Sequence, residues 1–226
     1  GGIAEYDICG LCGGDITDSG ECLYAFDYDG NVYETVVIGN QKWMAENLKT
    51  KHYRNGDEIV NANSSTQNST WLEDVGAFIY YNFDEDYHDI DGLLYNAYVI
   101  DDGRGICPEA WHVPSDDEWK TLEMELGMSS AEANGVGWRG TDEEGAKLKD
   151  VDFGGNNSSG FTAVPSGFRN YPNLLFEHFG NMVYYWTSTQ NSGDDVWARV
   201  LTHDELRINR SSHNRNHGFS IRCIQD

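Results

Sequence analysis

The chain has little positive charge and no long apolar run. Its 226 residues contain 15 Lys and Arg against 38 Asp and Glu, which gives a formal net charge of −23. Self-repulsion of that size disfavours polyanionic partners, so we expect no nucleic-acid binding. No apolar run approaches the ~18–20 residues of a membrane-spanning helix, so no transmembrane segment is expected. The first residues do not resemble a signal peptide, and we expect a processed region.

The composition is that of a folded domain. Hydrophobic residues make up 39% of the chain and aromatic residues 13%, which is too aromatic for a disordered polymer. The length suits one large domain with an appendage. Composition changes near Phe26, after a segment rich in Gly, Asp and Cys. We therefore expect an N-terminal arm or linker over 1–26 and a single domain over 27–226.

Five cysteines divide into a cluster of three, Cys9, Cys12 and Cys22, and a distant pair, Cys107 and Cys223. The CxxC in the cluster is compatible with zinc or redox chemistry. However, no fourth zinc ligand follows nearby, and the flanking βαβ pattern of a redox site is absent. A disulfide-linked turn segment of a secreted protein is the favoured interpretation. It pairs Cys9 with Cys22 and leaves Cys12 as a candidate intermolecular thiol.

Two helices are indicated in the middle of the chain. Ser115 to Glu118 has the sequence of a capping box, and apolar residues follow at helical spacing until Gly127. A second, shorter helix is expected over 141–148, and 129–134 is expected to add a turn. Residues 61–70 are polar and predict an exposed loop.

Strand patterns lie on either side of these helices. Residues 32–38 and 41–44 read as two strands joined by a Gly39-Asn40 hairpin turn. The last 45 residues alternate as strands separated by turn residues, with Phe219, Ile221 and Cys223 in the final one. Central helices followed by a run of antiparallel strands predict the α+β class.

Six motifs, kept in order, resemble one family. The motifs are DGNVYETVVIGNQKWMAENL (29–48), GICPEAWHVPSDDEW (105–119), GAKLK (145–149), GFTAVPSG (160–167), YWTST (185–189) and GFSIRCI (218–224). Together they resemble the Fibrobacter succinogenes major paralogous domain, over about residues 27–225. The resemblance implies a C-type lectin-like fold, related to that of formylglycine-generating enzymes, in an extracytoplasmic module whose ends come together.

The same resemblance implies that Cys107 is joined to Cys223. Closing a loop of about 115 residues would stabilise the fold by roughly 4–5 kcal/mol in the chain-entropy model. Enzymes that share this fold class use a pair of cysteines at the active site, whereas these two are expected to form a disulfide. His112, Ser166 and Ser188 lack the partners of a catalytic constellation. We therefore expect no enzymatic activity.

Acidic clusters suggest calcium as the one candidate cofactor. Oxygen ligands alternate in an acidic loop that ends in Gly92, and a second set lies in the N-terminal arm. The alternative interpretation is a solvated acidic surface without an ion. The candidate ligands are Asp84, Asp86, Asp89 and Asp91 in the loop and Asp7 and Asp15 in the arm.

A basic segment near the C-terminus suggests a contact surface. Five of the nine arginines lie within 199–222, where the only acids are Asp204 and Glu205. Such a patch would suit an anionic glycan or an acidic face of another copy. Alternatively, these arginines neutralise acids within the fold. The candidate contact residues are Trp186, Trp197, Arg199, Arg207, Arg210 and Arg215.

These observations together predict a secreted or surface-anchored, non-catalytic bacterial module. It would serve adhesion, with a glycan or another surface ligand as partner. A self-assembling subunit of an extracellular filament, joined to other copies through its N-terminal arm, is the alternative. An enzyme related to formylglycine-generating enzymes is a distant third.

Overall fold

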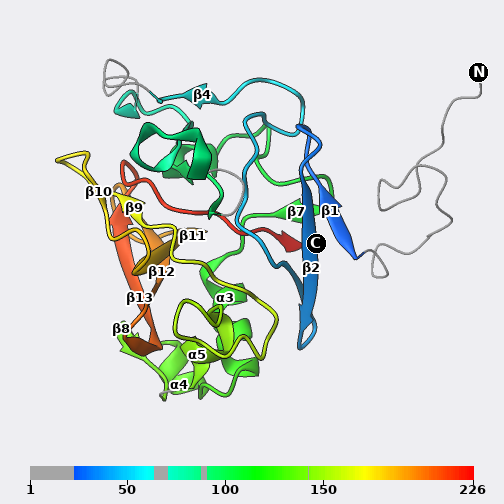
Figure 1. Cartoon of the computed structure of the whole chain (residues 1–226), viewed down its shortest axis with the longest axis vertical. Helices are drawn as coiled ribbons and strands as arrows, with labels where there is room; N and C mark the ends of the chain where they lie inside the picture. The colour runs from blue at the N-terminus through cyan, green and yellow to red at the C-terminus, as the bar shows by residue number, and fades with distance from the viewer. Residues whose placement is uncertain (1–22, 64–70, 88–90, 142) are drawn as a thin grey trace, which may run out of the picture.

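The computed structural model describes residues 23–63, 71–87, 91–141 and 143–226, which form a mixed α and β fold with mostly antiparallel sheets (Figure 1). Its α-helices in these residues are α3 (Asp116–Glu125), α4 (Ser130–Ala133) and α5 (Glu144–Leu148). Three short 3₁₀ turns accompany them, namely η3 (Tyr81–Phe83), η4 (Glu85–Tyr87) and η5 (Ala97–Val99). The α+β prediction is confirmed at this level.

The first sheet joins the two ends of the described chain. Its strand order is β1-β2-β3-β14-β7. In register, Ile38 of β2 faces Gln41 of β3 across the predicted Gly39 turn, and Ile224 of β14 pairs with Trp43 of β3. The five strands are β1 (Tyr24–Phe26), β2 (Val32–Ile38), β3 (Gln41–Met44), β14 (Ile224–Gln225) and β7 (Trp111–His112).

The second large sheet is built from the C-terminal meander, in the order β11-β12-β13-β8. Two smaller sheets, β4-β5-β6 and β10-β9, complete the topology of the described residues. The strands are β11 (Met182–Gln190), β12 (Asp195–Thr202), β13 (Glu205–Asn214) and β8 (Gly137–Arg139), with β4 (Val60–Asn61), β5 (Ala77–Ile79), β6 (Leu94–Tyr95), β9 (Phe168–Arg169) and β10 (Phe176–Glu177).

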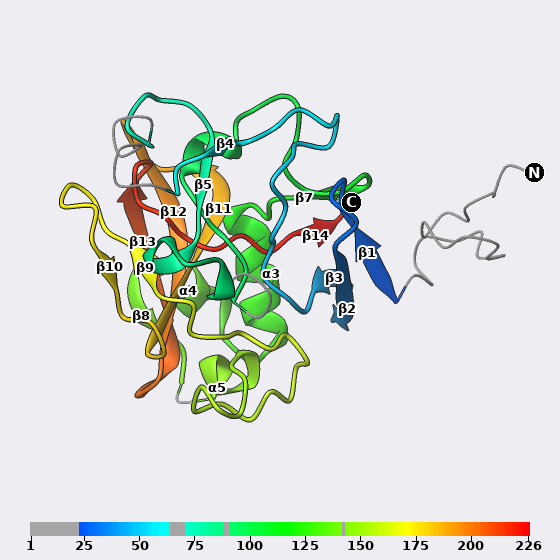
Figure 2. The same cartoon turned by 45° about the horizontal axis from the view of Figure 1, so that its top comes forward.

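Helix α3 lies between the two large sheets (Figure 2). It begins at the predicted capping box, in which Ser115 and Glu118 each bond the other's backbone amide. The buried side chain of Trp119 contacts Trp43 of β3 at a ring-centroid distance of 5.0 Å and Tyr185 of β11 at 5.7 Å. Aromatic burial of this kind is a large favourable contribution, and here it fixes both sheets to one helix.

The GAKLK motif holds α5 against the β12–β13 hairpin. A Cβ atom at Gly145 would lie 2.5 Å from the carbonyl oxygen of Leu206, so only glycine allows this approach. Lys149, which is buried, donates from Nζ to the carbonyl oxygens of Thr202 at 2.9 Å and of His203 and Glu205 at 3.1 Å. Burial lowers the pKa of Lys149. The motif therefore serves packing and hairpin capping.

A buried ionic network joins α3 to the second large sheet. Glu123 accepts from both terminal nitrogens of Arg139, at 2.9 and 2.7 Å, and from Nε of Arg199 at 2.6 Å. Asp116 accepts from Arg199 at 2.8 Å and twice from Arg210 at 2.8 Å. Burial alone would raise the pKa of Asp116, but the Arg210 hydrogen bonds and the Arg199 charge hold it well below its ordinary value. The two carboxylates and three guanidinium groups offset the cost of each other's burial, although Nε of Arg139 has no hydrogen-bond partner.

Two expectations about the chain ends need correction. Phe219, Ile221 and Cys223 do not form a strand, because this segment makes only isolated bridges, at Phe219 and Ser220, before β14 begins. Tyr24–Phe26 pair with β2 in the first sheet, so the domain reaches back to at least Tyr24, within the segment expected to be an arm. Cys9, Cys12 and Cys22, and most of the expected loop over 61–70, lie outside the described residues.

Candidate functional site

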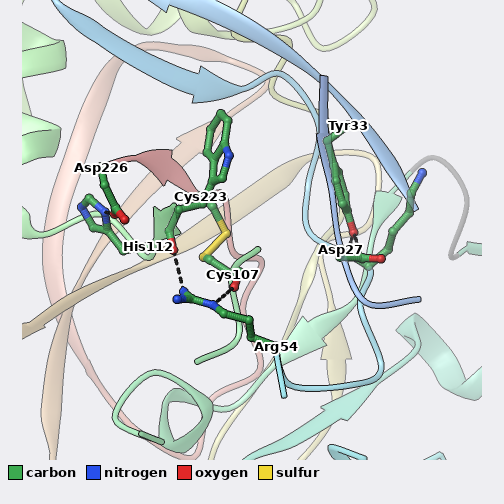
Figure 3. The surroundings of a disulfide bond; sticks show 9 residues. Asp27, Tyr33, Arg54, Cys107, His112, Cys223 and Asp226 are labelled. Carbon is green, nitrogen blue, oxygen red and sulfur yellow. Dashed lines mark hydrogen bonds and ion pairs between the residues drawn. A yellow bond between two sulfur atoms is a disulfide. The ribbon is translucent and has the colours of Figure 1, made fainter. Parts of the chain in front are cut away.

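A disulfide links Cys107, which precedes β7, to Cys223, which precedes β14 (Figure 3). The sulfur atoms are 2.03 Å apart and the Cα atoms 6.0 Å apart, across a sequence separation of 116. Both side chains are buried. The pairing that the family resemblance implied is confirmed, and these two sulfur atoms form a covalent cross-link of the fold.

Arg54 adds a non-covalent brace beside this cross-link. Its Nε donates to the carbonyl oxygen of Cys107 at 3.0 Å, and its Nη2 donates to that of Trp111 at 2.9 Å (Figure 3). A hollow of about 220 Å³ opens on one side of Arg54. It is lined by Phe26, Asp27, Tyr28, Thr50, His52, Arg54, Ile106, Cys107, Pro108 and Glu109.

The carboxylates beside this hollow are already bonded within the chain. Asp29 accepts from the backbone amide of Lys51 at 2.6 Å and lies 2.5 Å from Nδ1 of His52. Partial burial would raise the pKa of Asp29, but these contacts and the Thr50 hydroxyl lower it. Asp27 accepts from the buried Tyr33 hydroxyl at 2.6 Å (Figure 3). The carboxylates of Asp27 and Asp29 therefore stabilise the local backbone and side chains.

His112, on β7 of the first sheet, bridges two carboxylates near the C-terminus of the chain. Its Nδ1 lies 2.6 Å from Asp226 and its Nε2 lies 2.8 Å from Glu118 of α3. Partial burial alone would lower the pKa of His112, whereas the hydrogen bonds to Asp226 and Glu118 raise it above its ordinary value. Within the described residues, His112 is hydrogen-bonded to these two carboxylates and to no serine, threonine or cysteine side chain. Its role is to tie the C-terminal strand to α3.

This bridge predicts a pH dependence of stability. Because the pKa of His112 is raised on folding, its contribution is fully present below the ordinary pKa near 6.5 and is lost as pH rises through the folded value. We expect His112→Gln to lower the melting temperature most at pH 6, with a difference from wild type that shrinks between pH 6.5 and 8.5. Thermal melts across this range measure it. His203→Gln, on an exposed histidine, is the control, and a difference that grows with pH would contradict the prediction.

The calcium candidates are only partly described. Asp89, Asp7 and Asp15 lie outside the described residues. Asp84 and Asp86 are exposed, and Asp84 Oδ1 accepts from the Asp86 amide at 3.0 Å, as in an Asx turn. Burial raises the pKa of Asp91 to about 6. Within the described part of the chain, no group of three or more His, Cys, Asp or Glu has a metal-binding arrangement, and calcium remains a prediction.

The expected ligand-contact residues are mostly engaged inside the fold. Trp186 and Arg199 are fully buried, which corrects the expectation that they lie at a contact surface. Trp186 donates to the Tyr95 carbonyl oxygen, and Arg199 belongs to the buried ionic network. Arg210 is 7% exposed and lies 3.6 Å from the ring centroid of Trp197, so it too faces inward.

The remaining two arginines form ion pairs nearer the surface. Arg207 pairs with Glu205 at 2.6 Å, and Arg215 pairs with Asp101 at 2.5 Å. Burial lowers the pKa values of His213 and His217, the latter to about 4, so these histidines are neutral at neutral pH. The alternative interpretation of the basic segment, in which its arginines neutralise acids within the fold, is the one that these contacts support.

Burial of arginine makes the rest of the chain more acidic than its net charge indicates. The buried charged side chains of the described residues sum to +3, so the remainder of the chain carries −26. The buried cations are Arg139, Lys149, Arg169, Arg199, Arg210 and Arg222, and the buried acids are Asp116, Glu123 and Glu144. An acidic exterior disfavours the anionic glycan considered above.

Sequence reasoning missed a group of surface aromatic residues, the exposed aromatic cluster, made of Tyr81, Phe83, Tyr87, Phe176 and Phe179. The first three lie on the η3–η4 segment and the other two on and after β10. Phe83 is 37% exposed and the other four are half-buried. The aromatic residues at 81, 83 and 87 indicate such a cluster in the sequence. The acidic residues between them, however, were interpreted as calcium ligands.

Comparisons with known proteins give a family and no close relative. The model of the family described as the Fibrobacter succinogenes major domain matches residues 36–225. No curated protein and no solved structure matches the chain at a significant level. The C-type lectin-like fold therefore remains a prediction. No helix in the described residues has the length and apolar character needed to cross a membrane.

Proposed function

This chain belongs to the Fibrobacter succinogenes major domain family, and from that premise we propose that it is a non-catalytic adhesion module. The family is typical of bacterial surface proteins and is generally non-catalytic. The proposed module acts outside the cell, where an oxidising environment preserves its disulfide. It binds a surface ligand without chemical turnover.

The Cys107–Cys223 disulfide is the observation that carries this proposal. A disulfide cannot supply the thiolates on which cysteine-dependent chemistry relies. Both cysteines are buried, and Arg54 donates a hydrogen bond to the backbone beside them, so this region has a structural role. The acidic exterior favours neutral or cationic ligands, and it replaces the anionic glycan of the earlier expectation.

A binding assay on the full chain tests the proposal. Fluorescently labelled, unreduced protein is mixed with bacterial cells and with insoluble extracellular polysaccharides, and its depletion from the supernatant is measured. We expect monodisperse particles by negative-stain imaging and retention on at least one surface. Reduced and alkylated protein is the control and is expected to lose retention. Turnover of a glycan or peptide substrate would contradict the proposal.

A filament subunit is the second candidate, favoured by the edge of the first sheet. Strand β1 is the outermost strand in the described order, and an unpaired edge can accept a strand from another copy. Leu23, Tyr24 and Val32 on this edge hairpin are 71%, 39% and 45% exposed. The same imaging separates the candidates, because filaments at low protein concentration would support the second and not the first.

A further inference from the structure

The exposed aromatic cluster is assembled from two segments distant in sequence. Tyr81 contacts Phe176 and Phe179 at ring-centroid distances of 5.2 and 4.9 Å, and Phe83 contacts Phe176 at 5.0 Å. Tyr87 contacts Phe179 at 4.7 Å. Each contact joins the η3–η4 segment (81–87) to the β10 segment (170–180). The five rings therefore form one contiguous cluster across both segments.

Two of the five rings rest on the core, which keeps them in place. Tyr81 and Phe176 pack against a buried group that contains Trp71, Ile79 and Leu94. The buried guanidinium of Arg169 lies 5.8 Å from the Phe176 ring centroid. Rings that are already ordered lose little conformational entropy when a ligand binds, so this surface is preorganised.

The geometry of the rings limits what can bind. An aromatic cage for a quaternary ammonium group requires space between ring faces. Here the centroid distances of 4.7 to 5.6 Å place the rings in direct contact, so a ligand can lie only on the outer side of the cluster. Because the ring planes are inclined to one another by 40° to 85°, the outer side offers separate ring faces and edges, which suits successive units of an extended ligand.

The surrounding charges limit the ligand further. Neither 81–87 nor 170–180 contains Lys or Arg, and Asp84, Glu85 and Asp86 are exposed beside Phe83, where Lys51 interacts electrostatically with Glu85. Anionic glycans and anionic lipid surfaces would be repelled. A second copy in a two-fold contact would bring the same carboxylates face to face, which is also unfavourable. A neutral ligand rich in hydroxyl groups avoids these costs.

We propose that the exposed aromatic cluster is a binding platform for a neutral polysaccharide. The C–H faces of the sugar rings pack on the outer side of the cluster, led by Phe83. Sugar hydroxyl groups donate hydrogen bonds to the carboxylates of Asp84 and Asp86, which as ionised acids can only accept. This inference rests on the proposed adhesion function and names its ligand class and its site.

Affinity gel electrophoresis of the full chain in soluble neutral polysaccharides tests this inference. Hydroxyethyl cellulose, galactomannan and arabinoxylan are the probes, with polygalacturonate as the anionic comparison. We expect at least one neutral probe, and not polygalacturonate, to retard the protein. Phe83→Asn is expected to weaken that binding at least tenfold. Asparagine is chosen because Phe83 has a φ of 61°, a conformation that asparagine tolerates.

Matched variants distinguish a lost platform from a misfolded protein. Trp138→Ser is the control, because Trp138 is also 37% exposed but lies on β8, and it is expected to bind as wild type does. Phe179→Asn, in the other segment of the cluster, is a second test that does not depend on Phe83, because the Phe179 ring contacts Tyr81 and Tyr87. We expect it to weaken binding as well, and thermal melts confirm that each variant is folded.

The outcomes separate this inference from the proposed function. Binding that survives in both the Phe83→Asn and the Phe179→Asn variants overturns the platform and leaves the adhesion function standing. Binding to cells or to polygalacturonate, without binding to any neutral probe, also overturns the platform and leaves the adhesion function standing. A wild-type chain retained on no polysaccharide and on no cell surface contradicts both.

Discussion

Replacing Glu123 with glutamine is expected to lower the free energy of unfolding by about 3–5 kcal/mol, because it leaves the buried Arg139 without its counter-ion and removes one of the two carboxylates that pair with Arg199. Glu123 and Arg199 are fully buried, and Arg139 is 5% exposed. The amide has nearly the shape of the carboxylate, so the loss reports charge and hydrogen bonding more than a cavity. Urea unfolding at pH 7, followed by tryptophan fluorescence, measures it.

Glu125→Gln is the matched control, on the same helix but exposed. Surface substitutions away from special features usually change stability by less than about 0.5 kcal/mol, and we expect that here. A loss at Glu123 no larger than the loss at Glu125 would show that the ionic network does not hold α3 to the second sheet.

Replacing both Cys107 and Cys223 with serine is expected to cost roughly 4–5 kcal/mol, chiefly by freeing the unfolded chain. The magnitude follows from the sequence separation of 116 that the bond closes. Thermal melts with and without a phosphine reductant measure it. Wild-type protein is expected to fall to the melting temperature of the double variant when reduced, whereas reductant leaves the double variant unchanged.

The other three cysteines supply the control. A chain with serine at Cys9, Cys12 and Cys22 keeps only the described disulfide, so it is expected to respond to reductant as wild type does. Alkylation of the unreduced protein gives an independent check by mass spectrometry. Labelling of Cys107 and Cys223 in that experiment would mean that the bond is absent, and the catalytic alternative would have to be reconsidered.

The local elements of this fold were predictable because their signals are local. The capping box at Ser115 and the Gly39 turn depend on neighbouring residues, and both lie where the sequence predicts them. The final strand was misplaced because Phe219 and Ile221 alternate as a strand would. Their backbone partners, including Tyr95 and Leu48, come from distant segments that the pattern does not reveal.

The candidate sites were harder to predict because burial depends on tertiary structure. The sequence predicts that Arg199 and Arg210 lie in a surface patch. In the structure they are buried, because they pair with Asp116 and Glu123, which are more than seventy positions away in the sequence. Conversely, the contact of Tyr81 with Phe176 and Phe179 joins segments about 95 residues apart. The disulfide pairing was anticipated from the family resemblance, and the internal pairing of these arginines was anticipated as the alternative interpretation of the basic segment.

The cross-link between Cys107 and Cys223 also determines how the molecule responds to traction. If force is applied to the two ends of the chain, it is transmitted through the disulfide from Cys107 to Cys223. The segment between these two cysteines then carries no tension. At about 3.4 Å per residue, that segment withholds roughly 400 Å of contour length. The helices, the second large sheet and the β10 segment all lie within it. They are therefore shielded from stretching, while the strands from β1 to β6 bear the strain.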